Sequence, residues 1–147
     1  MKVEAALSEL ESLLPGLNYV VSLDLHRVPT IPRGTPEQYV AAALGPKAVV
    51  GGTAEVATAD MLAEVERCIR WAGDRGSHPD EAAIRSPRLN ELVACVLGHL
   101  KRVAASSTGV WSFWLKDGHP HYPVQWDFAY VLAGPSGAEV FIGSSSD

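Results

Sequence analysis

Cysteines are scarce in this chain. Its 147 residues include only Cys68 and Cys95, and each lies in a segment with a helical pattern. Neither belongs to a CxxC motif or to a Cys/His cluster, which excludes a disulfide-stabilised scaffold and a zinc module. We therefore expect both to be ordinary thiols in or near the core.

Long apolar runs are also absent. Glu4, Glu9 and Glu11 interrupt the leucines of the first fourteen residues, where a signal peptide would need a continuous apolar stretch. No window reaches about 18 apolar residues, the length of a membrane-spanning helix. The sequence thus predicts a cytoplasmic protein with no membrane partner.

Basic clusters are missing as well. The formal net charge is −5, and the densest basic pair, Lys101-Arg102, falls near the expected end of a helix, where it suits the helix dipole. Proteins that bind nucleic acids usually carry a basic patch, so we expect no nucleic-acid partner. An acidic balance instead favours encounter with a basic protein.

What the chain does have is clear periodicity. Apolar residues recur at helical spacing in three segments, and a capping box, Thr35-Pro36-Glu37-Gln38, starts a shorter helix. Alternating residues predict strands elsewhere, and Asp117-Gly118 is typical of a hairpin turn. The expected helices are 2–14, 35–44, 59–73 and 86–105, and the expected strands are 18–27, 47–53, 110–116, 123–133 and 138–143.

The order of these elements predicts a single α+β domain over residues 1–147. Strands grouped at the C-terminus, after a group of helices, indicate an antiparallel sheet with helices packed on one face. That sheet should contain a C-terminal three-stranded meander and the N-terminal strand, in an order that the sequence leaves open. Two aromatic sets should share the face beneath the helices, namely Trp111, Phe113 and Leu115 together with Trp126, Phe128 and Tyr130.

Alternation places Trp114 out of phase with those sets, on the open face of the meander. A tryptophan among polar neighbours is either covered by a loop or offered to a partner. Trp71 lies outside the apolar stripe of its helix. It is either covered by the loop at 74–85 or free to contact a partner. We predict a partner-binding surface made of these two tryptophans and three polar residues around Trp114, which are Gln125, Asp127 and Glu139.

Candidate chemistry is limited to histidines and aspartates. Asp24 and His26, like His119 and His121, are two residues apart, a spacing at which strand side chains can share a ligand. Pro120 interrupts the second pair, and local spacing fixes no third metal ligand. We find no nucleophile elbow and no phosphate-binding loop. We therefore expect no metal, no cofactor and no catalytic residue.

These features favour a non-enzymatic protein-binding module. The most specific version is a bacterial immunity protein, which neutralises a cognate toxin, such as a basic toxin domain, by direct binding; a more general adaptor is also open. The alternative is a small-ligand-binding protein or enzyme whose pocket, between sheet and helices, is lined by Asp24, His26, His119, His121 and Asp127. The partner and the oligomeric state stay open.

Overall fold

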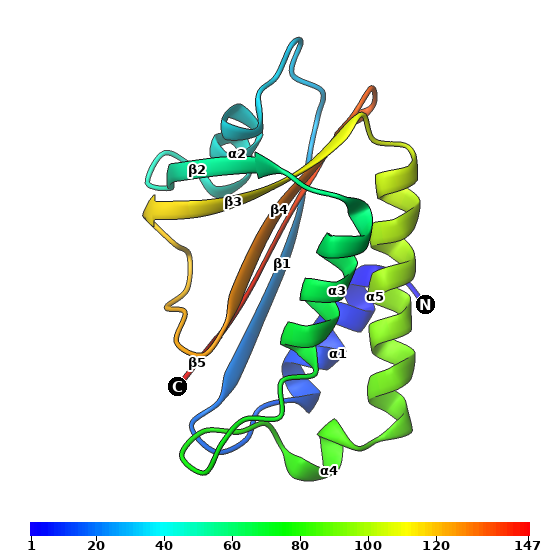
Figure 1. Ribbon diagram of the computed structural model, residues 1–147, viewed down its shortest axis with the longest axis vertical. Coiled ribbons are helices and arrows are strands. Elements are labelled where there is room, and N and C mark those ends of the chain that lie inside the picture. Colours follow the sequence, from blue (N-terminus) through cyan, green and yellow to red (C-terminus); the bar gives the residue numbers. More distant parts are fainter.

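A five-stranded antiparallel sheet forms the centre of the structure, a computed structural model that describes residues 1–147 (Figure 1). Its order, β1-β5-β4-β3-β2, confirms an α+β fold in which the N-terminal strand joins the three C-terminal strands. The strands are β1 (Val20–Val28), β2 (Val49–Glu55), β3 (Gly109–Asp117), β4 (Asp127–Gly134) and β5 (Gly137–Ser146). The helices are α1 (Val3–Leu13), α2 (Pro36–Leu44), α3 (Thr58–Ile69), α4 (Glu81–Ile84) and α5 (Pro87–Ala105).

Helices α1, α3 and α5 form a layer over one face of the sheet (Figure 1). Their apolar stripes pack against side chains that point from β1, β4 and β5 toward that layer. The N-cap serine expected for α5 is present, since Ser86 Oγ accepts a hydrogen bond from Leu89 N. Buried members of this core include Leu10, Met61, Val65, Leu92, Val96, Tyr130 and Phe141.

The short helix α2 covers the other face of the sheet. Its predicted capping box is confirmed: Gln38 N donates to Thr35 Oγ1, and Thr35 N donates to Gln38 Oε1. Tyr39 and Val40 of α2 are buried against a second apolar cluster on this side. The sheet is therefore covered on both faces, by three helices on one side and by α2 on the other.

The second core corrects one expectation from the sequence. Phe113, with Trp111 and Leu115 beside it, packs in the cluster under α2 and not beneath the three-helix layer. The register explains the difference, because Trp111 pairs with Val131 whereas Ser112 pairs with Tyr130. Alternation correctly grouped the side chains within each strand, but it could not show which groups of neighbouring strands share a face.

The β3–β4 connection is also longer than the sequence suggested. Strand β4 begins at Asp127, not at 123, and residues 118–126 form a loop in place of a hairpin turn. Gly118 does adopt a positive φ of 76°. The loop contains Pro120 and Pro123, which have no N–H to donate to a strand ladder. The β3–β4 pairing accordingly stops at Ser112 and Tyr130, and the second half of β3 pairs with β2 alone.

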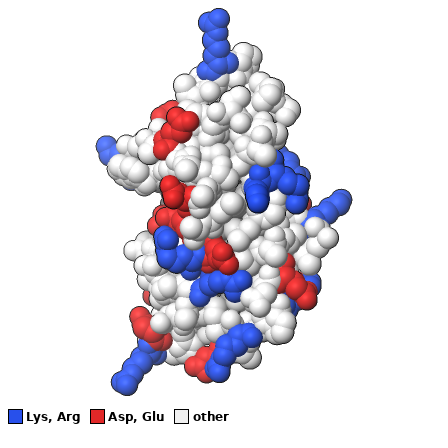
Figure 2. Space-filling view, turned by 45° about the vertical axis from the view of Figure 1, so that its right-hand side comes forward, with Lys and Arg blue, Asp and Glu red and all other residues white.

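Charged side chains of both signs are interspersed over the helix layer, which is turned toward the viewer in Figure 2. Most of the arginines there have a carboxylate neighbour, as in the pairs Arg70–Glu66 and Arg85–Glu81. Exposed pairs of this kind contribute little to stability. No helix of the structure combines the length and the hydropathy needed to cross a membrane.

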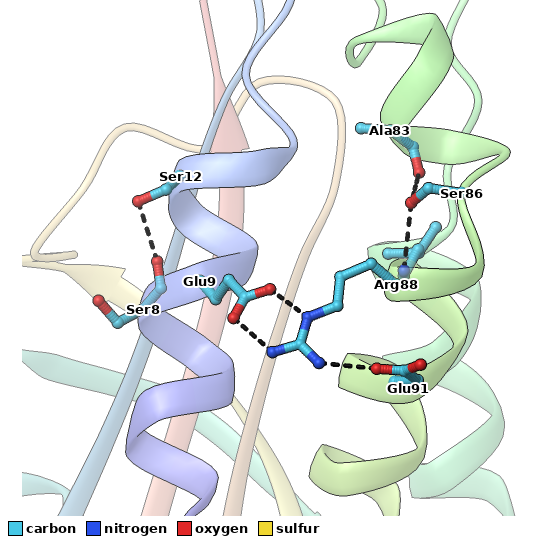
Figure 3. Close-up of polar contacts among 8 residues, drawn as sticks. Ser8, Glu9, Ser12, Ala83, Ser86, Arg88 and Glu91 are labelled. Carbon is cyan, nitrogen blue, oxygen red and sulfur yellow. Dashed lines mark hydrogen bonds and ion pairs between the residues drawn. The ribbon is translucent and has the colours of Figure 1, made fainter. Parts of the chain in front are cut away.

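Arg88 makes the most extensive of these contacts, between α5 and α1 (Figure 3). Its guanidinium donates to both carboxylate oxygens of Glu9, with Nη2 at 2.6 Å from Oε1, and its Nη1 lies 2.7 Å from Glu91 Oε2. A bidentate pair fixes orientation as well as distance. The hydrogen bond from Arg88 lowers the pKa of Glu9 below its usual value.

We expect Leu92→Ala to destabilise the protein by about 2–5 kcal/mol, because a fully buried leucine leaves a cavity in the helix-layer core. The measurement is the free energy of unfolding in urea. Lys101→Ala, on the exposed side of the same helix, should change it by less than about 0.5 kcal/mol. Equal effects of the two substitutions would contradict the core assignment.

Candidate functional site

Trp114 is the large apolar side chain that stands out on β3, because 58% of its surface is exposed. Its ring lies over Gly51 and Gly52 of the neighbouring strand; a Cβ built on Gly52 would come within 2.8 Å of the indole Nε1, and one on Gly51 would overlap the ring. Gly52 is its partner in the β2–β3 register. The indole N–H makes no hydrogen bond within the chain. The two glycines thus form a seat that holds the ring while leaving one side of it open.

The surroundings of Trp114 differ from those that alternation suggested. Its neighbours Phe113 and Leu115 point toward α2, so Trp114 points to the opposite face. Asp127 is exposed, but it pairs with Ser144 and is in phase with Ala129 and Val131, which belong to the α2 side. Trp114 and Asp127 therefore lie on opposite faces of the sheet, and the predicted surface does not contain both.

Glu139 and Gln125 are engaged within the fold. His99 Nε2 lies 2.8 Å from Glu139 Oε1 beneath the end of α5, and only 13% of the glutamate side chain is exposed. Gln125 donates from Nε2 to Ser77 Oγ at 2.6 Å and accepts from Ser145 Oγ at 3.0 Å. Both contribute to internal packing, in contrast to the open surface predicted for them.

Trp71 likewise packs internally. It follows the end of α3 and stacks on Tyr19, with ring centroids 5.3 Å apart. The Tyr19 hydroxyl accepts a hydrogen bond from Trp126 Nε1 at 2.8 Å, and burial raises the pKa of Tyr19 to about 12. Trp71 is only half-buried, and its structural partner is Tyr19 rather than the 74–85 loop that the sequence suggested.

The histidines and aspartates do come together, on the α2 side of the sheet. His121 Nε2 lies 2.7 Å from Asp24 Oδ2, which ties the β3–β4 loop to β1. The backbone N–H of His121 donates to His119 Nδ1 at 2.9 Å. Burial lowers the pKa of His119. Nε2 of His119 and Nε2 of His26 are both buried without a hydrogen-bond partner.

This cluster does not form a ligand pocket between sheet and helices. Asp24, His26, His119, His121 and Asp127 line neither of the two largest hollows of the surface. One hollow, of about 570 Å³, lies beside the N-terminal end of α1; the other, of about 260 Å³, lies between the end of α5 and the β4–β5 turn. No three His, Cys, Asp or Glu side chains are arranged to hold a metal ion.

The two thiols offer no nucleophile–base pair. Burial raises the pKa of the Cys68 thiol to about 11, so it is protonated at neutral pH. Cys95 Sγ donates to the backbone carbonyl of Met1, while His99, one helical turn away, is bonded to Glu139. The Cys95–His99 contact that their spacing allows is therefore not made.

Tyr122 is a highly exposed aromatic residue that the sequence analysis did not single out. It belongs to the 118–126 loop and is 80% exposed, more than any other large apolar side chain. The signal was present, since Pro120 and Pro123 flank it and exclude a regular strand there.

Comparison with known protein families, characterised proteins and solved structures finds no match to this chain. The function is therefore inferred from the surface features themselves.

We predict that the purified, untagged protein contains no stoichiometric metal. The Asp24–His121 pair lacks a third ligand, so a chelator should leave the thermal midpoint unchanged. Elemental analysis for zinc and nickel, with melting curves in the presence and absence of chelator, tests this. One equivalent of either metal would contradict it and would favour the histidine cluster as a site.

We further predict that Gly51→Ala displaces the Trp114 ring, because the added Cβ occupies its seat. The measurement is ¹⁹F NMR of 5-fluorotryptophan-labelled protein, with the Trp114 resonance assigned from Trp114→Phe. Gly76→Ala serves as a control, since a Cβ there meets only Asp74 Oδ1, at 3.7 Å. The seat would be disproved by a Trp114 resonance that does not move in Gly51→Ala.

Proposed function

We propose that this chain is a non-enzymatic protein-binding module in which Trp114 is an anchor for the partner. The observation that carries the proposal is that Trp114 is 58% exposed and lies with its ring against Gly51 and Gly52 of the neighbouring strand. Tryptophan is enriched among the residues that dominate binding energy at protein interfaces. A side chain with an unused N–H and an open ring face offers both polar and apolar contacts.

The glycine seat matters for affinity as well as for exposure. A partner that orders a mobile side chain loses part of the binding free energy to conformational entropy, about 0.5–1.5 kcal/mol for a side chain with many rotamers. One face of the Trp114 ring already lies against the two glycines. Binding to it should therefore incur little of that cost, as in other preorganised aromatic contact surfaces.

The more specific form of the proposal is an immunity protein that acts in the bacterial cytoplasm and neutralises a cognate toxin by direct contact. The net charge of −5 supports a basic partner through long-range attraction. Both cysteines are free, which is usual in a reducing compartment. The alternative of a ligand-binding protein or enzyme has the Asp24–His121 pair in its favour but no enclosing pocket.

The test is co-expression with the product of the adjacent gene, followed by titration calorimetry of the purified pair. Trp114→Ala should weaken binding by about 2 kcal/mol or more, roughly 30-fold in Kd, while the melting curve changes little. Lys101→Ala, an exposed truncation on α5, should leave Kd unchanged. Equal affinity of Trp114→Ala and the unaltered protein would remove Trp114 from the interface, and no complex with the neighbouring product would count against the immunity role.

A further inference from the structure

A second exposed apolar surface lies at the end of the sheet opposite to the β4–β5 turn. Three large apolar side chains are open to solvent there: Val20 is 46% exposed, Tyr122 80% and Val124 47%. We call these residues, together with Asp24, Asp127 and Asp147, the Tyr122 surface. No role in the fold explains the exposure of its tyrosine.

The strand register brings these residues together. Val20 pairs with Ser146 at the end of β5, and Val124 N donates to Ser145 O from the other side of that strand at 2.8 Å. Neighbouring strands lie about 4.8 Å apart, so the two valines flank β5 within about 10 Å. Asp127 pairs with Ser144 one step further along, and Asp147 follows Ser146.

The segments that build this surface, 19–26, 118–134 and 137–147, carry carboxylates and no lysine or arginine. They contribute Asp24, Asp127 and Asp147, of which the last two are exposed. The helix layer differs, because acidic and basic side chains alternate over it (Figure 2). An apolar centre with an acidic rim is complementary to a cationic segment of a partner.

The loop that presents Tyr122 is held at both ends. His121, the residue before it, is bonded to Asp24 of β1 at 2.7 Å. On the other side, Trp126 N donates to Ser145 Oγ at 3.1 Å, and Ser145 N donates to Trp126 O at 3.0 Å. These contacts fix the loop on β1 and β5 and leave the phenol ring projecting from it.

We infer that the Tyr122 surface binds a lysine- or arginine-rich segment of a protein partner. Tyr122 contacts the aliphatic part of a basic side chain and presents its ring face to the cation, and the aspartates balance the charge. The inference rests on the proposed function, which it deepens by naming the chemistry of the partner. It uses a face of the sheet different from that of Trp114.

A defined probe tests this surface without the natural partner. We would titrate ¹⁵N-labelled protein with the peptide Lys-Lys-Trp-Lys-Lys and, separately, with Glu-Glu-Trp-Glu-Glu, and follow amide shifts by NMR. The expected result is that shifts caused by the cationic peptide concentrate at residues 20–24, 121–127 and 144–147, and weaken as salt increases. The acidic peptide should cause no saturable shifts there.

Variants make the assignment quantitative. Tyr122→Ala and Asp127→Asn should each raise the Kd of the cationic peptide about threefold or more, whereas Glu55→Gln, which removes an exposed carboxylate from β2, should leave it unchanged. The same spectra report whether each variant is folded. Shifts that map elsewhere, or equal effects of Asp127→Asn and Glu55→Gln, would overturn the inference.

The outcome is separable from that of the proposed function. If the neighbouring gene product binds through Trp114 but the cationic peptide does not map to the Tyr122 surface, only this inference fails. If the peptide maps there as expected and no protein partner binds, the surface chemistry stands and the immunity role fails.

Discussion

The sheet and the helix layer on it depend on β5, which pairs with β1 on one side and with β4 on the other along nearly its whole length. Without β5, β1 would have no strand neighbour, because it forms the edge of the sheet. Helix α1 packs on β1, and Arg88 joins α1 to α5, so the position of the helix layer follows from this central pairing. The same pairing places Asp24 beside the β3–β4 loop, whose His121 reaches it.

Local signals in the sequence predicted the fold class and every element except the four-residue helix α4. The capping box at Thr35, the Ser86 cap and the change from helical to alternating period at about Gly109 all predicted features that the structure contains. The sequence did not predict on which face of the sheet some side chains lie, because that depends on how neighbouring strands pair. The face occupied by Phe113 depends on the β3–β4 register, and that register is fixed by packing across strands and by the α2 side chains.

For the predicted surface around Trp114, too, the sequence predicted local features but not contacts between distant segments. Trp114 was correctly expected to be out of phase with Trp111 and Phe113, because alternation within one strand is local. Its glycine seat could not be expected, since Gly51 and Gly52 precede it by some sixty residues and meet it only through the β2–β3 pairing. Glu139 and Gln125 were misplaced for a related reason: their partners, His99 and Ser77, come from distant helical and loop segments.

The central place of β5 also has a consequence for biosynthesis. The ribosome makes β1 early and β5 last, yet the two strands are adjacent in the sheet. At about 5–20 residues per second, β1 waits on the order of ten seconds for its neighbour. During that time its backbone and its Val21 and Leu23 side chains lie open to other chains. The β1–β5 pairing can therefore form only after nearly all of the chain has been made, whatever the stability of the finished sheet.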